Sequence, residues 1–122
     1  MKAFLAALIT LSLLVGGVIS ATAAGTEKLD EYLDALPAEE AKLPEAARVL
    51  GELGDRVEEG DRLLLCSLYH HEKIDTLASA VRRAEAAAEA EDDAEYRILR
   101  GELESLIEDM KRDLHLHIDD IV

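Results

Sequence analysis

The chain has 122 residues, a formal net charge of −14 and no tryptophan. This length allows one small domain, and 49% hydrophobic with 33% charged residues excludes a disordered tail and a polytopic membrane protein. The negative charge repels phosphate backbones and anionic lipid headgroups, so it argues against nucleic-acid binding and favours cations or a basic protein as partners.

Aromatic residues make up only 3% of the chain, so its core must be built from Leu, Ala, Ile and Val. These residues suit helix-on-helix packing, in which Ala allows close approach and Leu fills the seam. A β-sandwich would carry more Val, Thr and aromatic residues. The composition therefore predicts an all-α fold.

The first element is an apolar leader. Lys2 precedes an uncharged stretch from residue 3 to residue 25. A secretory signal peptide has this pattern, and Ala-Thr-Ala at 21–23 fits a cleavage motif. A single membrane helix needs ~20 apolar residues, which residues 3–24 also supply. Both interpretations, a cleaved signal and an uncleaved anchor, stay open.

The charges on either side of the leader predict its orientation. Lys2 lies before it, whereas Glu27, Asp30 and Glu31 follow it. The positive-inside rule then keeps the N-terminus in the cytoplasm. We expect residues 1–25 to be a signal peptide or membrane anchor and residues 26–122 to form an extracytoplasmic helical domain. The protein is then single-pass at the cell membrane or, after cleavage, secreted.

Two short helices are predicted next. Thr26 is a fair N-cap for a helix that Pro37 ends, and its apolar stripe consists of Leu29, Tyr32, Leu33 and Leu36. Pro44 suits the first turn of a second helix. Glycines weaken this helix at residues 51, 54 and 60. We expect a bend near Gly60, where Asp61 is placed to cap the following helix.

A long helix is predicted from Arg62 to Glu91. Residues at three- and four-residue spacing form one stripe, which includes Ser67 and His70 among apolar side chains. Asp92 and Glu95 then form a capping box for a last helix, whose stripe consists of Leu99, Leu103, Leu106, Met110 and Leu114. The expected architecture is an antiparallel helical hairpin turning at Asp92-Asp93, or a small three-helix bundle that includes the earlier helices.

This hairpin brings the four histidines to one end. Two imidazoles and one or two carboxylates on facing helices resemble the donor set of a zinc site, and the candidate metal ligands are His70, His71, Asp75, His115 and His117. Adjacent histidines on a helix point about 100° apart, however, and an H-x-H spacing is not a helical chelate. A structural polar cluster, in which His70 donates to Asp113 or to a backbone carbonyl, and a pH-sensitive contact are the alternatives.

Cys66 is the single cysteine, so the chain has no internal disulfide. Its neighbours read Leu-Leu-Leu-Cys-Ser-Leu, which predicts a small buried hydrophobe. His70 lies four residues further on, so a Cys–His nucleophile pair on one helix face is the alternative. Because no other feature is typical of a thiol active site, we expect no catalytic residue and no cofactor.

Several short segments carry a resemblance to a known family. They are His71, Glu72, Ile74 and Asp75, then Ala90 and Asp92, and finally Asp120 and Ile121. With the apolar leader, this order resembles domain of unknown function family 4363, small membrane-anchored helical proteins found mainly in Firmicutes. The resemblance implies an anchored helical protein outside the cytoplasm and implies no biochemical activity.

Together these patterns predict a non-enzymatic, membrane-anchored or exported helical protein. It is expected to contact another membrane or cell-envelope protein and, if its leader is uncleaved, the membrane through residues 3–24. The alternative is divalent-metal binding or sensing through the histidine and aspartate side chains.

Overall fold

A computed structural model describes the backbone of residues 2–121, and the side chains of that range except residues 18, 19, 21, 22 and 115–121. Within this part the chain contains helices and no strand, which confirms the all-α prediction. The elements are α1 (Lys2–Ala35), α2 (Leu43–Asp55), the π-helical segment η1 (Arg56–Gly60), α3 (Arg62–Leu68), α4 (His71–Glu89) and α5 (Asp93–Ile121).

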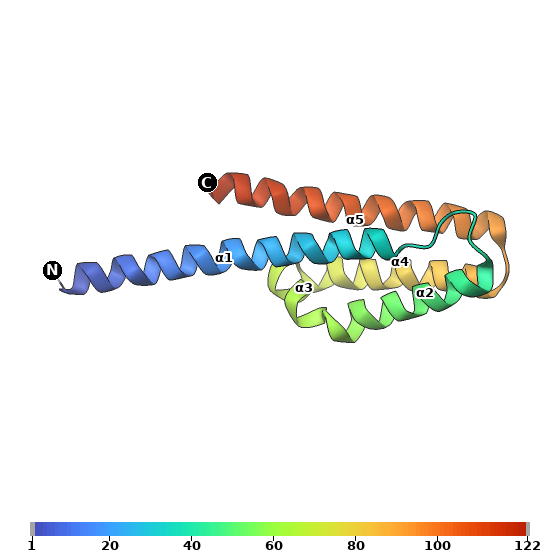
Figure 1. The fold of residues 1–122 in the computed structure, drawn as a ribbon, viewed down its shortest axis with the longest axis horizontal. Helices are drawn as coiled ribbons and strands as arrows, with labels where there is room; N and C mark the ends of the chain where they lie inside the picture. The colour runs from blue at the N-terminus through green and yellow to red at the C-terminus, as the bar shows by residue number, and fades with distance from the viewer. Residues whose placement is uncertain (1, 122) are drawn as a thin grey trace.

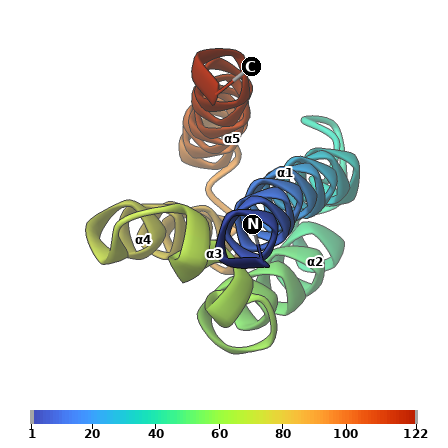
Figure 2. The ribbon, with the colours of Figure 1, turned by 90° about the vertical axis from the view of Figure 1, so that its left-hand side faces the viewer.

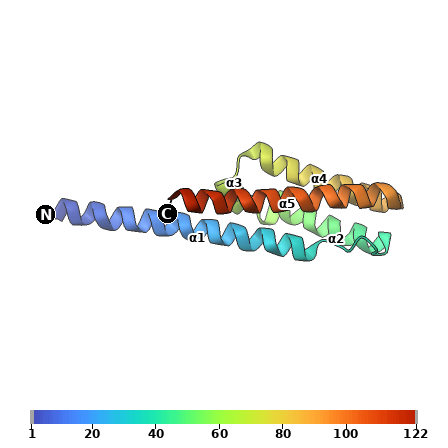
Figure 3. The same ribbon diagram turned by 90° about the horizontal axis from the view of Figure 1, so that it is seen from above.

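Four long helices run alternately in opposite directions, with η1 and α3 linking the second to the third (Figures 1 and 3). α2 packs mainly against α4, α4 against α5, and α5 against α1. Viewed along the helices, α4, α5, α1 and α2 surround a shared core (Figure 2). The predicted antiparallel hairpin is therefore present as α4 and α5. α1 and α2 pack alongside this hairpin, as expected of the earlier helices, and the bundle has one long helix more than the three-helix alternative.

Buried aliphatic and tyrosine side chains hold these helices together. Three- and four-residue spacing places them on one face of each helix. The largest fully buried side chains are Tyr32, Tyr96, Leu29, Leu50, Leu65, Ile74, Leu77, Leu103, Ile107, Met110, Val57 and Val81.

The first helix begins far earlier than the predicted N-cap. α1 runs without a break from Lys2 to Ala35, so Thr26 lies inside the helix. No proline precedes Thr26, and the helix continues through the Gly16-Gly17 pair. Gly25 is buried at this point, and a Cβ there would lie 2.3 Å from Leu68 Cδ1. A glycine is therefore needed here so that Leu68 can pack closely against α1. At the other end of α1, the predicted helix end before Pro37 is confirmed.

The N-terminal half of α1 lies outside the bundle (Figures 1 and 3). Every residue from 2 to 17 is exposed, including Phe4 at 74% and Leu13 at 71%. Leu29 and Tyr32 of the same helix, and Leu36 directly after it, are buried in the core. α1 thus divides into an exposed apolar half and a half that belongs to the bundle. Among the described residues, no helix combines the length and the apolar character that crossing a membrane requires.

The long helix predicted from Arg62 to Glu91 is interrupted. Tyr69 and His70 adopt extended backbone angles (φ −130°, ψ 156° and φ −64°, ψ 148°) between α3 and α4. Tyr69 donates its hydroxyl hydrogen to the backbone carbonyl of Met110 on α5. His70 and Ser67 are exposed rather than part of the buried stripe. The Tyr69 hydroxyl contact with α5 accompanies the break in the helix. Helix spacing alone predicted neither the contact nor the break.

The chain's three tyrosines each bond a different part of the bundle. Tyr32 on α1 donates to Asp61 Oδ2 at 2.6 Å, and Tyr96 on α5 donates to the carbonyl of Ala38 at 3.0 Å. Asp61 precedes α3 but makes no side-chain cap hydrogen bond, so the predicted cap is wrong and this carboxylate binds α1 instead. Buried hydroxyls with partners of this kind fix the relative positions of helices.

Candidate functional site

Two cavities flank the interruption between α3 and α4. The first has a volume of about 320 Å³, and the second about 310 Å³. Leu68, Tyr69 and His70 line both of them. Breaking the helix here opens space on either side of the extended segment, so the break itself creates the concave surface.

The first cavity lies between this segment and α5. Besides the three shared residues it is lined by Lys73, Asp113 and Leu114. Tyr69 is partly buried, and its burial raises its pKa, to which the nearby Asp113 carboxylate adds. The tyrosine therefore stays neutral and keeps its hydroxyl bonded to α5. The register predicted from the hairpin, with His70 opposite Asp113, is confirmed to the extent that both line this cavity.

The second cavity contains the cysteine and the other histidine of the segment. Cys66 Sγ lies 3.6 Å from His71 Nδ1, and both residues line the cavity with Ser67. The predicted partner of the thiol was His70, which is wrong because the break shifts the register by one residue. Cys66 is also partly exposed rather than buried.

The candidate metal ligands do not converge where they are described. His71 contacts Cys66, His70 lines both cavities without a side-chain cap hydrogen bond, and Asp75 forms an ion pair with Arg62 at 3.5 Å. Among the side chains that the structure describes, no group of three His, Cys, Asp or Glu residues is placed to hold a metal ion. The side chains of His115 and His117 lie outside the described residues, so a site that includes them stays a prediction. The alternative in which His70 is a bonded core residue is wrong, because His70 is exposed.

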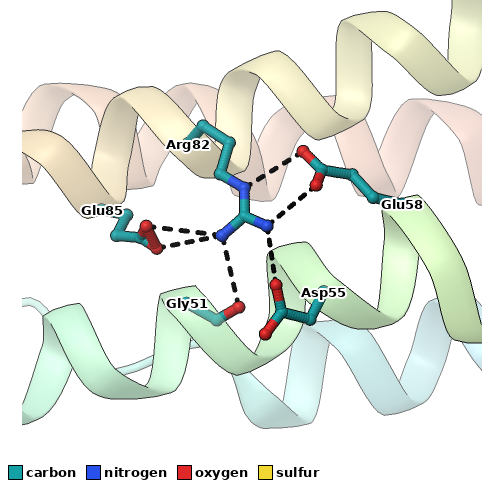
Figure 4. Close-up of polar contacts among 5 residues, drawn as sticks. All are labelled: Gly51, Asp55, Glu58, Arg82 and Glu85. Carbon is teal, nitrogen blue, oxygen red and sulfur yellow. Dashed lines mark hydrogen bonds and ion pairs between the residues drawn. The ribbon is translucent and has the colours of Figure 1, made fainter.

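A separate cluster of charges lies between α2, η1 and α4 (Figure 4). Arg82 Nε and Nη2 donate to the two carboxylate oxygens of Glu58, at 3.1 Å and 2.9 Å. The same guanidinium donates to Asp55 at 2.8 Å, to Glu85 at 3.2 Å and to the carbonyl of Gly51 at 3.4 Å. All these acceptors surround one cation, which joins three helical segments.

Hydrogen bonding shifts the pKa values of Glu58 and Arg82 in this cluster. The bond from Arg82 lowers the pKa of Glu58, and the bonds to Glu58 and then Asp55 raise the pKa of Arg82. Gly54 lies beneath the guanidinium, where a Cβ would meet Arg82 Cζ at 2.6 Å. The cluster is saturated with internal contacts, so its evident chemistry is to hold α4 against α2.

Sequence reasoning missed both Arg82 and Lys73. Arg82 lies in a run of strongly helix-forming residues, and nothing in that run distinguishes it from its neighbours. One signal was present: the glycines at 51 and 54 are spaced to leave room on one face of α2 for a large side chain from another helix.

Comparisons of the chain with models of known protein families, with curated proteins and with solved structures gave no match. The resemblance to domain of unknown function family 4363 therefore stays a prediction.

Proposed function

We propose that this chain is an exported, non-enzymatic helical module that acts by contacting another protein of the membrane or cell envelope. The observation that carries the proposal is the division of α1. Its exposed half, residues 2–17, is free of charge after Lys2, whereas its other half completes the bundle. Because the exposed half buries none of its side chains in the fold, its apolar character serves another purpose.

Delivery to the membrane is the purpose that fits this segment. A secretory leader combines a basic start, an apolar middle of about 7–15 residues and small residues before the cut. Lys2, the exposed residues up to Val15 and the Ala-Thr-Ala at 21–23 follow that order. In the proposal the segment delivers residues 26–122 to the outer side of the membrane. Its removal or retention decides between a secreted and an attached protein.

The surface of the bundle supports a contact role. The net charge of −14 favours a partner with a basic surface, which electrostatic attraction would guide to the bundle. Many polar side chains are already used to fix helices, as Arg82, Tyr32 and Tyr96 are. We therefore propose that the domain recognises a partner rather than catalysing a reaction.

Crosslinking in intact cells with a reagent that does not cross the membrane tests the proposal. It predicts capture of a membrane or envelope protein with a basic surface, and less capture as salt concentration rises. A His71→Ala/Asp75→Ala variant shows whether the exposed start of α4 belongs to the contact surface, with Ser79→Ala as a control on the same helix. A chain that this reagent does not reach in intact cells contradicts the proposal.

A further inference from the structure

We propose that the cavity between the α3–α4 interruption and α5 binds a small zwitterion with an apolar side chain, of the class of the free apolar amino acids. This binding site is independent of export and of any protein partner. Three features of the cavity carry the proposal: its opposite charges, its apolar lining and its size.

Opposite charges line the cavity without neutralising each other. Lys73 on α4 and Asp113 on α5 both border it, yet no ion pair joins them. Neither side chain forms an ion pair with any other described residue. Most other lysine and arginine side chains of the bundle have carboxylate partners, as Lys28, Lys111 and Arg100 do. A ligand with both a carboxylate and an ammonium group complements this pair, because each charge meets its opposite.

The carboxylate end has further support on α4. Lys73 lies in the first turn of this 19-residue helix, where the helix dipole favours negative charge. The side chain of His70 makes no cap hydrogen bond with this turn and borders the same cavity. The ligand carboxylate therefore belongs beside Lys73, which places its ammonium group toward Asp113.

Leucine side chains provide the apolar part of the cavity. Leu68 and Leu114 line it, and both pack closely over Gly25 of α1. A branched aliphatic side chain from the ligand would cover these leucines and remove apolar surface from water. A volume of about 320 Å³ is at the lower end for ligand pockets, which suits a molecule the size of an amino acid.

Calorimetric titration of the full-length chain, kept in solution with a mild detergent, tests the proposal with L-leucine as the probe. N-acetylleucine lacks the ammonium group and leucinamide lacks the carboxylate. Each should bind about tenfold or more weakly than leucine, because each leaves one cavity charge without a partner. This comparison uses the unmodified chain, so it does not depend on a variant that folds.

Two variants then assign each charge. Lys73→Met should weaken leucine binding about tenfold and remove the preference for leucine over leucinamide. Asp113→Asn should do the same and remove the preference for leucine over N-acetylleucine. Lys42→Met and Glu102→Gln change exposed charges elsewhere and should leave binding unaltered. No saturable heat from leucine, equal binding of either capped analogue, or unchanged binding in both cavity variants overturns the proposal.

Discussion

Replacing Arg82 with methionine removes the cation that joins α2, η1 and α4 while keeping an unbranched apolar stem. The side chain is 33% exposed, so its ion pairs are partly screened by water. It makes three ion pairs, with Glu58, Asp55 and Glu85. Exposed pairs each contribute about 0.2–1 kcal/mol, and the doubly bonded Glu58 lies at the upper end of this range.

The three pairs together give an expected loss of about 2 kcal/mol in the free energy of unfolding. For a domain of this size, that loss lowers Tm by on the order of 10 °C. Urea denaturation followed by circular dichroism measures the first quantity, and thermal denaturation the second. Arg83→Met is the matched control, because Arg83 is the exposed neighbour on the same helix and should change the free energy of unfolding by less than about 0.5 kcal/mol.

The dependence on pH provides a second readout of the same contact. The pKa of Glu58 is lower in the folded chain than its ordinary value, so its contribution is present above that ordinary value and is lost as pH falls through the folded pKa. The difference in the free energy of unfolding between the original chain and the Arg82→Met variant should therefore become smaller in acid. Equal stabilities of the Arg82→Met and Arg83→Met variants at neutral pH would refute the assignment of Arg82 as the joint between these helices.

Three further perturbations probe the bundle. In urea titrations, Leu77→Ala should lower the free energy of unfolding by about 3 kcal/mol, because Leu77 is fully buried. Ser79→Ala, at an exposed position of the same helix, should lower it by less than about 0.5 kcal/mol. Gly25→Ala should cost about 1–3 kcal/mol, because its Cβ displaces Leu68, and an unchanged Tm would contradict that packing. Above pH ~10, stability should fall by about 1.4 kcal/mol per pH unit for each tyrosine with a raised pKa, and Tyr32→Phe should make this decline less steep.

Local patterns correctly predicted the turn between α4 and α5 and the helix that follows it. The turn at residues 90–92 and the last helix follow from spacing and from capping chemistry. Glu95 N–H donates to Asp92 Oδ1 at 3.2 Å, which is one half of the predicted capping box, whereas the Asp92 N–H donates to the carbonyl of Ala87. The hairpin register also placed His70 near Asp113. These features depend on neighbours in sequence or on one antiparallel pair.

Features that depend on several helices at once were not predictable. At the interruption Tyr69 bonds a carbonyl of α5, and Asp61 accepts a hydrogen bond from a hydroxyl of α1. Helix spacing treats a continuous run as one helix, so it missed the break and assigned Cys66 the wrong histidine. Capping chemistry placed a helix start at Thr26, because local sequence could not show that the apolar residues 3–24 and the bundle share α1.

The central claim is that the exposed half of α1 exports the bundle. A fusion of alkaline phosphatase to the C-terminal end tests it, because that reporter folds only where its disulfides form, outside the cytoplasm. We expect the fusion of the original chain to be active and the Leu8→Arg/Leu11→Arg double variant to be inactive. Leu63→Arg should leave the fusion active, because Leu63 is 88% exposed on the bundle. An inactive fusion of the original chain, or equal activity in all three, would contradict the account.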